Sequence, residues 1–163
     1  MFCGSYHEEN PSHDSLFSDL ADRLLLHSSM SEDRYKQTAL FELQNALVNK
    51  DIYKANKIIN YFAQNPKKNP IQMTLALLFS FFSNVMMSYY APEKSERGIA
   101  EFLGLRNSWG VGDYIKAMRN YRAVHVMEIL HLIRLADAQS KGAEGAALPD
   151  GEIMRELLYK IMH

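Results

Sequence analysis

The sequence has only one cysteine and nearly equal numbers of acidic and basic residues. Each of these two facts makes certain classes of protein less suitable as an interpretation. Its one cysteine, Cys3, cannot form an internal disulfide, so we expect a reducing, cytoplasmic setting. Lys and Arg number 18 against 19 for Asp and Glu, which gives a formal net charge of -1. A chain with this balance does not attract nucleic acid or an anionic membrane as a whole.

Targeting and membrane-spanning segments are also missing from the pattern. Residues 1–11 contain acids but neither Lys nor Arg, so they do not resemble a secretory signal. The most apolar stretch, 71–90, is about long enough to cross a bilayer. No basic cluster flanks it, and polar residues interrupt it at Gln72, Thr74, Ser80, Ser83, Asn84 and Ser88. We therefore expect a buried central helix and no membrane partner.

The sequence contains none of three common catalytic or nucleotide-binding motifs. The chain has no G-x-S-x-G, no G-x-x-x-x-G-K-[ST] and no G-x-G-x-x-G. The six histidines are scattered, and His125 and His131 point to different sides of one helix, so no set of metal ligands converges. Adjacent carboxylates such as Glu8 and Glu9 are expected to be solvated. We expect no enzyme activity, no cofactor and no metal ion.

What is present indicates an all-α domain. Hydrophobic residues make up 47% and charged residues 23% of 163, as in a globular protein with one core. Apolar residues recur at helical spacing, and no stretch alternates with the period of a strand. We predict a helical bundle of about seven or eight helices, at 15–27, 39–48, 52–64, 70–90, 95–103, 113–121, 124–138 and 150–162.

Three segments divide the chain. Residues 1–14 are predicted to be a disordered tail, because they are polar and hold Gly4 and Pro11. Residues 15–37 are predicted to form an N-terminal helix and a polar connection. Residues 38–163 are predicted to form the main helical domain.

Several helix ends can be predicted from single residues. Asp51 is expected to cap the helix that follows it. Pro66 is expected to end that helix, and Pro70 to occupy a harmless first-turn position in the next. Gly104 is expected to end a helix in the left-handed conformation. Residues 140–149, rich in Gly and Ala, are expected to be a flexible loop.

Two helices carry more specific expectations about burial. The helix 70–90 is apolar nearly all round, so we expect other helices to surround it. In the helix 52–64 one set of apolar residues is predicted to face inward, namely Ile52, Ala55, Ile58, Ile59 and Phe62.

The segment 95–122 has the outline of a helix-turn-helix DNA reader, since its second helix carries Lys116 and Arg119. The connection 106–113 is, however, about twice the usual length of such a turn. We favour a packed helical hairpin and expect no direct DNA contact. A DNA-binding regulator that uses Lys116 and Arg119 remains the alternative.

Aromatic residues suggest where another protein would bind. Aromatics and Met are enriched at subunit interfaces, and they also fill cores. We predict five interface anchors, with core packing as the competing interpretation: Tyr89, Tyr90, Trp109, Tyr114 and Tyr121.

The order and spacing of short motifs over 38–163 resemble the C-terminal domain of the DNA polymerase III delta subunit, a clamp-loader protein, in its Bacteroidetes-like form. The motifs are Phe41–Leu47, Lys50-Asp51, Lys54-Ala55, Tyr89–Pro92, Ile99-Ala100, Leu103–Leu105, Ala117–Tyr121, Ile133–Gly142 and Glu156–Ile161. Residues before 31 do not match the preceding lid domain of that family. We therefore expect an isolated C-terminal piece or the product of a shortened reading frame.

The resemblance implies a role in DNA replication. In that family the C-terminal domains of five subunits form a collar that holds the loader ring together, as part of a DNA-directed DNA polymerase assembly. The expected partners are the motor and delta-prime subunits, with self-association possible for the isolated chain. Nothing in the sequence matches the family's clamp-opening element, so this chain is expected neither to open a clamp nor to bind ATP.

Overall fold

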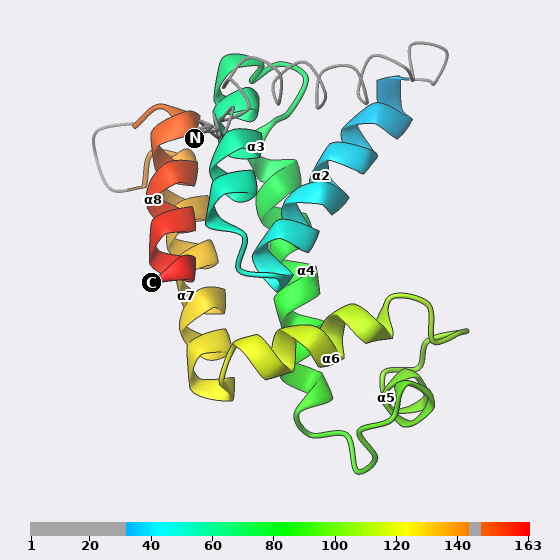
Figure 1. Cartoon of the computed structure of the whole chain (residues 1–163). Coiled ribbons are helices and arrows are strands. Elements are labelled where there is room, and N and C mark those ends of the chain that lie inside the picture. The colour runs from blue at the N-terminus through cyan, green and yellow to red at the C-terminus, as the bar shows by residue number, and fades with distance from the viewer. Residues whose placement is uncertain (1–31, 144–147) are drawn as a thin grey trace, which may run out of the picture. The chain divides into compact units, whose positions relative to one another are not determined.

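A computed structural model of the chain describes residues 32–143 and 148–163 (Figure 1). The chain divides into two compact units, Met1–Gln37 and Thr38–His163. The predicted tail 1–14 and the predicted helix 15–27 lie outside the described residues. The packing and contacts below belong to the second unit.

Over the residues that the structure describes, the fold is all-helical, with seven helices and no strand, which confirms the predicted helical bundle. The helices are α2 (Glu32–Val48), α3 (Ile52–Gln64), α4 (Ile71–Ser88), α5 (Glu96–Phe102), α6 (Val111–Asn120), α7 (Ala123–Ser140) and α8 (Asp150–Met162).

Four of these helices run side by side, α2 lies obliquely against them, and α5 and α6 lie at one end (Figure 1). α4 packs on α7, α7 on α8 and α8 on α3. α6 crosses the C-terminal end of α4, and α5 packs against α6 on the side away from α8 (Figure 1). The bundle thus has a projecting end formed by α5 and α6.

The helices enclose one large core and a small second cluster. The large core receives side chains from α2, α3, α4, α7 and α8, among them Leu43, Ile59 and Phe82, each at most 1% exposed. The second cluster lies between α5 and α6 around Ile99 and Val111. Because α5 rests on this small cluster, its position depends on α6.

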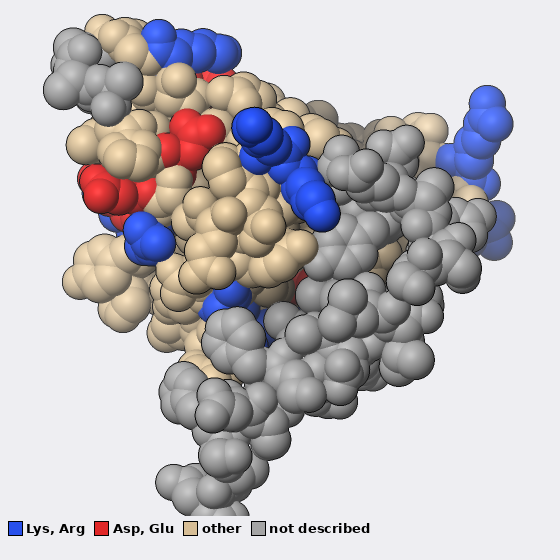
Figure 2. All heavy atoms as spheres, turned by 90° about the horizontal axis from the view of Figure 1, so that it is seen from above, with Lys and Arg blue, Asp and Glu red and all other residues tan. Residues whose placement is uncertain are grey.

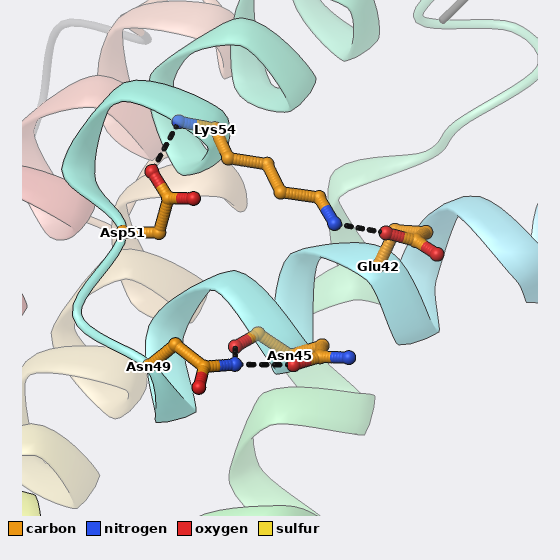
Figure 3. Close-up of polar contacts among 5 residues, drawn as sticks. All are labelled: Glu42, Asn45, Asn49, Asp51 and Lys54. Atoms are coloured by element: carbon orange, nitrogen blue, oxygen red, sulfur yellow. Dashed lines mark hydrogen bonds and ion pairs between the residues drawn. The ribbon is translucent and has the colours of Figure 1, made fainter.

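The helix ends follow local chemistry. Asp51 accepts a hydrogen bond of 2.9 Å from the backbone N–H of Lys54, which confirms the predicted cap (Figure 3). The Lys54 ammonium also pairs with Glu42 of α2, across the α2–α3 turn (Figure 3). Gly104 follows α5 with φ +67°, the left-handed conformation that was predicted. Local residues therefore set where α3 begins and where α5 ends.

The predicted boundaries were wrong at the start of α2 and of α6. α2 begins at Glu32, whereas residues 28–36 had been interpreted as a connection. That stretch lacks an apolar period, but from Glu32 it has no Gly or Pro and begins with two acids, which suit a helix start. α6 begins at Val111, directly after Gly110 with φ +86°, and so before the predicted Asp113. Neither start is marked by an apolar period. The start of α2 is marked by its two acids, and that of α6 by the left-handed conformation of Gly110.

The burial predictions also need correction. Ile52 is exposed, because it is the first residue of α3 and precedes the inward face formed by Ala55, Ile58, Ile59 and Phe62. α4 ends at Ser88, so Tyr90 lies in a turn beyond it. α4 itself is not surrounded, since only 44% of its residues are buried. Among the described residues it is the one helix long and apolar enough to cross a bilayer, a test that core helices also pass.

Candidate interaction surface

Two of the five predicted anchors hold the fold together. Tyr121 is 1% exposed, and its hydroxyl donates a hydrogen bond of 2.6 Å to the carbonyl of Leu47 in α2. The Tyr89 hydroxyl, at the end of α4, contacts the carbonyls of Met118 and Tyr121 at the end of α6. Tyr121 therefore offers a partner no surface, and Tyr89 is committed to joining α4 to α6.

Burial also changes the acidity of these two phenols. Desolvation raises the pKa of Tyr121 well above its ordinary value of about 10, and it raises the pKa of Tyr89 in the same direction. Both groups therefore remain neutral hydrogen-bond donors over the whole physiological range.

The other three anchors lie at the surface. Tyr90 is 67% exposed in the turn after α4, and Trp109 is 85% exposed in the turn before α6. The ammonium of Lys94 stabilises the first turn by donating to the carbonyls of Ser88, Tyr89 and Ala91 at 3.1, 2.6 and 2.6 Å. Tyr114 is half-buried in α6. Tyr90, Trp109 and Tyr114 are thus the anchors that a partner can reach.

Trp109 and Tyr114 line an open groove of about 1050 Å³ between α2, α4 and the α5–α6 end. Leu77 and Phe81 of α4 and Phe41 of α2 form its apolar lining. The Tyr114 ring packs 5.5 Å from that of Phe81, centroid to centroid. We call this groove, which is lined by α2, α4, α5, α6 and the turn before α6, the α2–α6 groove.

Polar groups of the α2–α6 groove are held in place by bonds within it. The Asn84 amide donates a hydrogen bond of 3.0 Å to the Tyr114 hydroxyl. The backbone N–H of Trp109 donates one of 3.1 Å to the Asn107 side-chain oxygen, which fixes the turn that carries the indole. The groove is therefore shaped before anything binds.

The charge of the α2–α6 groove has one sign. Glu96 and Asp113 line it, and within the described part of the chain no Lys, Arg or His does. One Glu96 carboxylate oxygen lies 3.4 Å from where a Cβ on Gly112 would stand, at the first turn of α6. The groove therefore combines an apolar lining with two carboxylates.

The exposed face of α4 is a second candidate surface, and it is uncharged. Residues 69–92, which include all of α4, contain no Asp, Glu, Lys or Arg. Met73, Phe79 and Met87 on this helix are between 42 and 49% exposed. A smaller groove of about 470 Å³ continues from it to Ile133 and Arg134 of α7. Large apolar side chains grouped in this way are typical of an interaction surface.

Searches of family models, curated proteins and solved structures found no match to this chain. In residues 32–143 and 148–163 no group of three or more His, Cys, Asp or Glu could hold a metal ion.

The geometry of α6 does not favour the alternative hypothesis, in which Lys116 and Arg119 bind DNA. Lys116 and Arg119 are exposed on α6, as that hypothesis needs. A recognition helix, however, presents its N-terminal residues to the bases. Here Asp113 lies in the first turn of α6 and Glu96 beside it, so this end would repel phosphate. Figure 2 shows the other end of the molecule from α6, where Lys and Arg side chains form several separate groups.

Sequence reasoning missed the polar members of the α2–α6 groove. Asn84 was interpreted only as an interruption of an apolar helix, and Asp113 only as a helix start. Nothing local reveals that Asn84 bonds to Tyr114, 30 positions later. The usable signal was the uncharged run 69–92 followed by acids at the start of α5 and α6.

Proposed function

We propose that this chain works by assembly: it is the C-terminal collar domain of a clamp-loader delta subunit, which holds sister subunits in the loader ring during DNA replication. The motif order in 38–163 supports the family, and the all-helical bundle suits a collar. The motor and delta-prime subunits are its partners, and it makes or breaks no bond itself.

The uncharged exposed face of α4 is the observation that carries this proposal. An exposed helix face normally bears charged residues, because their hydration favours solubility. On α4 that face presents Met73, Phe79 and Met87 to solvent. Burial of such side chains against another protein is favourable by about 25 cal/mol per Å² of apolar surface. A face of this kind is typical of a subunit contact, and ring assembly uses a different face on each side.

A mixing experiment tests the proposal. The full chain is combined with the motor and delta-prime subunits of the same organism at micromolar concentration and run on a sizing column. We expect the wild type to co-elute with them. The double variant Met73→Lys, Met87→Lys should elute alone, because two ammonium groups would be desolvated in the contact.

Tyr159→Lys is the matched control, since Tyr159 is exposed on α8. It introduces the same charge away from α4 and should co-elute like the wild type. Circular dichroism of each variant shows whether the helices are retained. A folded wild-type chain that never co-elutes would contradict the collar assignment.

A further inference from the structure

We propose that the α2–α6 groove is a docking cleft for a helical segment of a partner protein that presents Arg or Lys beside aliphatic side chains. This inference rests on the proposed function only in that both have the chain act by binding another protein. The two surfaces adjoin on α4, because Ser80 lines the groove and lies seven residues from both Met73 and Met87. They are tested by different variants, since the groove is entered at Trp109 and the collar contact is assigned to the two methionines.

Charge complementarity identifies the basic part of this partner. The groove carries the carboxylates of Glu96 and Asp113, and neither makes an ion pair with a described residue. The chain as a whole is nearly neutral, so this is a local concentration of negative charge. A guanidinium or ammonium that enters the groove could form ion pairs with both carboxylates, and no cation in the lining would repel it.

Trp109 provides the second argument. The side chain is 85% exposed, although burying an indole is among the largest apolar gains a residue can offer. It stands in a turn fixed by Asn107, at the rim of a groove with an apolar lining. Indole faces also bind guanidinium and ammonium groups. In a partner with aliphatic and basic side chains, the basic groups could bind the indole at the rim and the aliphatic groups could pack on the apolar lining.

The partner segment is expected to be a helix. Within the described residues there is no strand, so no sheet edge is offered for an added strand. A groove between helices suits an amphipathic helix that lays its apolar face on the lining. Leu77, Phe81 and Phe41 form that lining, and the two carboxylates lie beside them.

A competing explanation assigns the two carboxylates to folding alone. Asp113 lies in the first turn of α6 and Glu96 beside it, where negative charge favours the helix N-terminus. That role predicts that neutralising them lowers thermal stability and leaves peptide binding unchanged. The docking proposal predicts that binding is lost as well, so the two explanations are separable.

The test uses the single tryptophan of the chain as its probe. The full chain is titrated with a synthetic peptide of about four helical turns that has a leucine stripe flanked by two arginines. Matched peptides carry glutamate or glutamine at both arginine positions. We expect the arginine peptide alone to change the Trp109 fluorescence saturably, with an affinity that falls as salt rises.

Variants of the groove decide the interpretation, with calorimetry replacing fluorescence where the indole is removed. Trp109→Ala and the double variant Glu96→Gln, Asp113→Asn should each weaken binding at least about tenfold. Tyr159→Ala and Glu152→Gln, both on exposed positions of α8, should bind like the wild type.

Three results would overturn the docking proposal: equal binding of the glutamate peptide, preferential binding of a single-stranded oligonucleotide, or no response to the arginine peptide up to about 1 mM. The collar assignment is judged separately by the sizing column. Co-elution without any peptide response defeats only the groove, and peptide binding without co-elution defeats only the collar.

Discussion

At the scale of single residues, Tyr121 links the end of α6 to α2 and α4 from inside the bundle. It follows α6, its hydroxyl bonds to Leu47 of α2, and its ring meets that of Phe82 in α4 edge to face at 5.8 Å. Lys50 places its ammonium 4.9 Å from the centre of the same ring. A residue predicted as an interface anchor thus joins the helices from inside.

Tyr121→Phe should therefore destabilise the fold by about 1 kcal/mol at neutral pH, since it removes one buried hydrogen bond. Leu47 still accepts a bond from the Lys50 N–H, which limits the loss. Urea unfolding measures the change. The exposed Tyr159→Phe is the control and should stay within about 0.5 kcal/mol of the wild type.

A comparison of the wild type with Tyr121→Phe also gives a prediction about pH. Because the pKa of Tyr121 is raised in the fold, the unfolded chain loses this proton first as pH rises above about 10. The free energy of unfolding of the wild type should then fall, relative to Tyr121→Phe, by up to about 1.4 kcal/mol per pH unit. Parallel stability curves for the two proteins above pH 10 would refute the buried neutral phenol.

At the scale of helices, the contact of α3 with α8 depends on a glycine. A Cβ on Gly151, in the first turn of α8, would lie 2.6 Å from the Cβ of Ala63 in α3. Two carbon atoms cannot approach so closely, so Gly151 sets the distance between the two helices. Its role was not predicted, because the sequence of the predicted helix 150–162 does not show which helix packs against its first turn.

Gly151→Ala should destabilise the fold by about 1–2 kcal/mol, although alanine is the better helix former by up to about 1 kcal/mol. Gly112→Ala is the control, since its Cβ would meet only the end of the Glu96 side chain at 3.4 Å. The double variant Ala63→Gly, Gly151→Ala moves the methyl group to the other helix and should recover most of the loss. Thermal unfolding measures all three, and a Gly151→Ala protein as stable as the wild type would contradict the contact.

The sequence predicted those helices best that carry both an apolar period and a chemical end signal. α3 has Asp51 before it, and α8 has its apolar face between 150 and 162, so both were placed within one residue. α2 has no apolar period in its first turn, and its start was missed. The exposed side of α4 was missed because an all-round apolar pattern does not say which side its neighbours occupy.

At the scale of the whole molecule, two surfaces of the described residues are candidates for binding another protein. One is the uncharged face of α4, and the other is the α2–α6 groove with Trp109 at its rim. The groove could not be located from the sequence, since its lining comes from helices far apart in the chain. The exposed face of α4 could not, since the uncharged run 69–92 does not show which side the neighbouring helices cover. Both present large apolar side chains whose burial against a partner is favourable.

The central claim is that the exposed face of α4 is covered when this chain joins its sister subunits. Hydroxyl-radical footprinting of the full chain, alone and mixed with the motor and delta-prime subunits, tests it most directly. We predict that oxidation of Met73 and Met87 slows several-fold in the mixture, while that of Tyr159 on α8 is unchanged. Equal oxidation of both methionines in a co-eluting mixture, or protection of Tyr159 in their place, would contradict the claim.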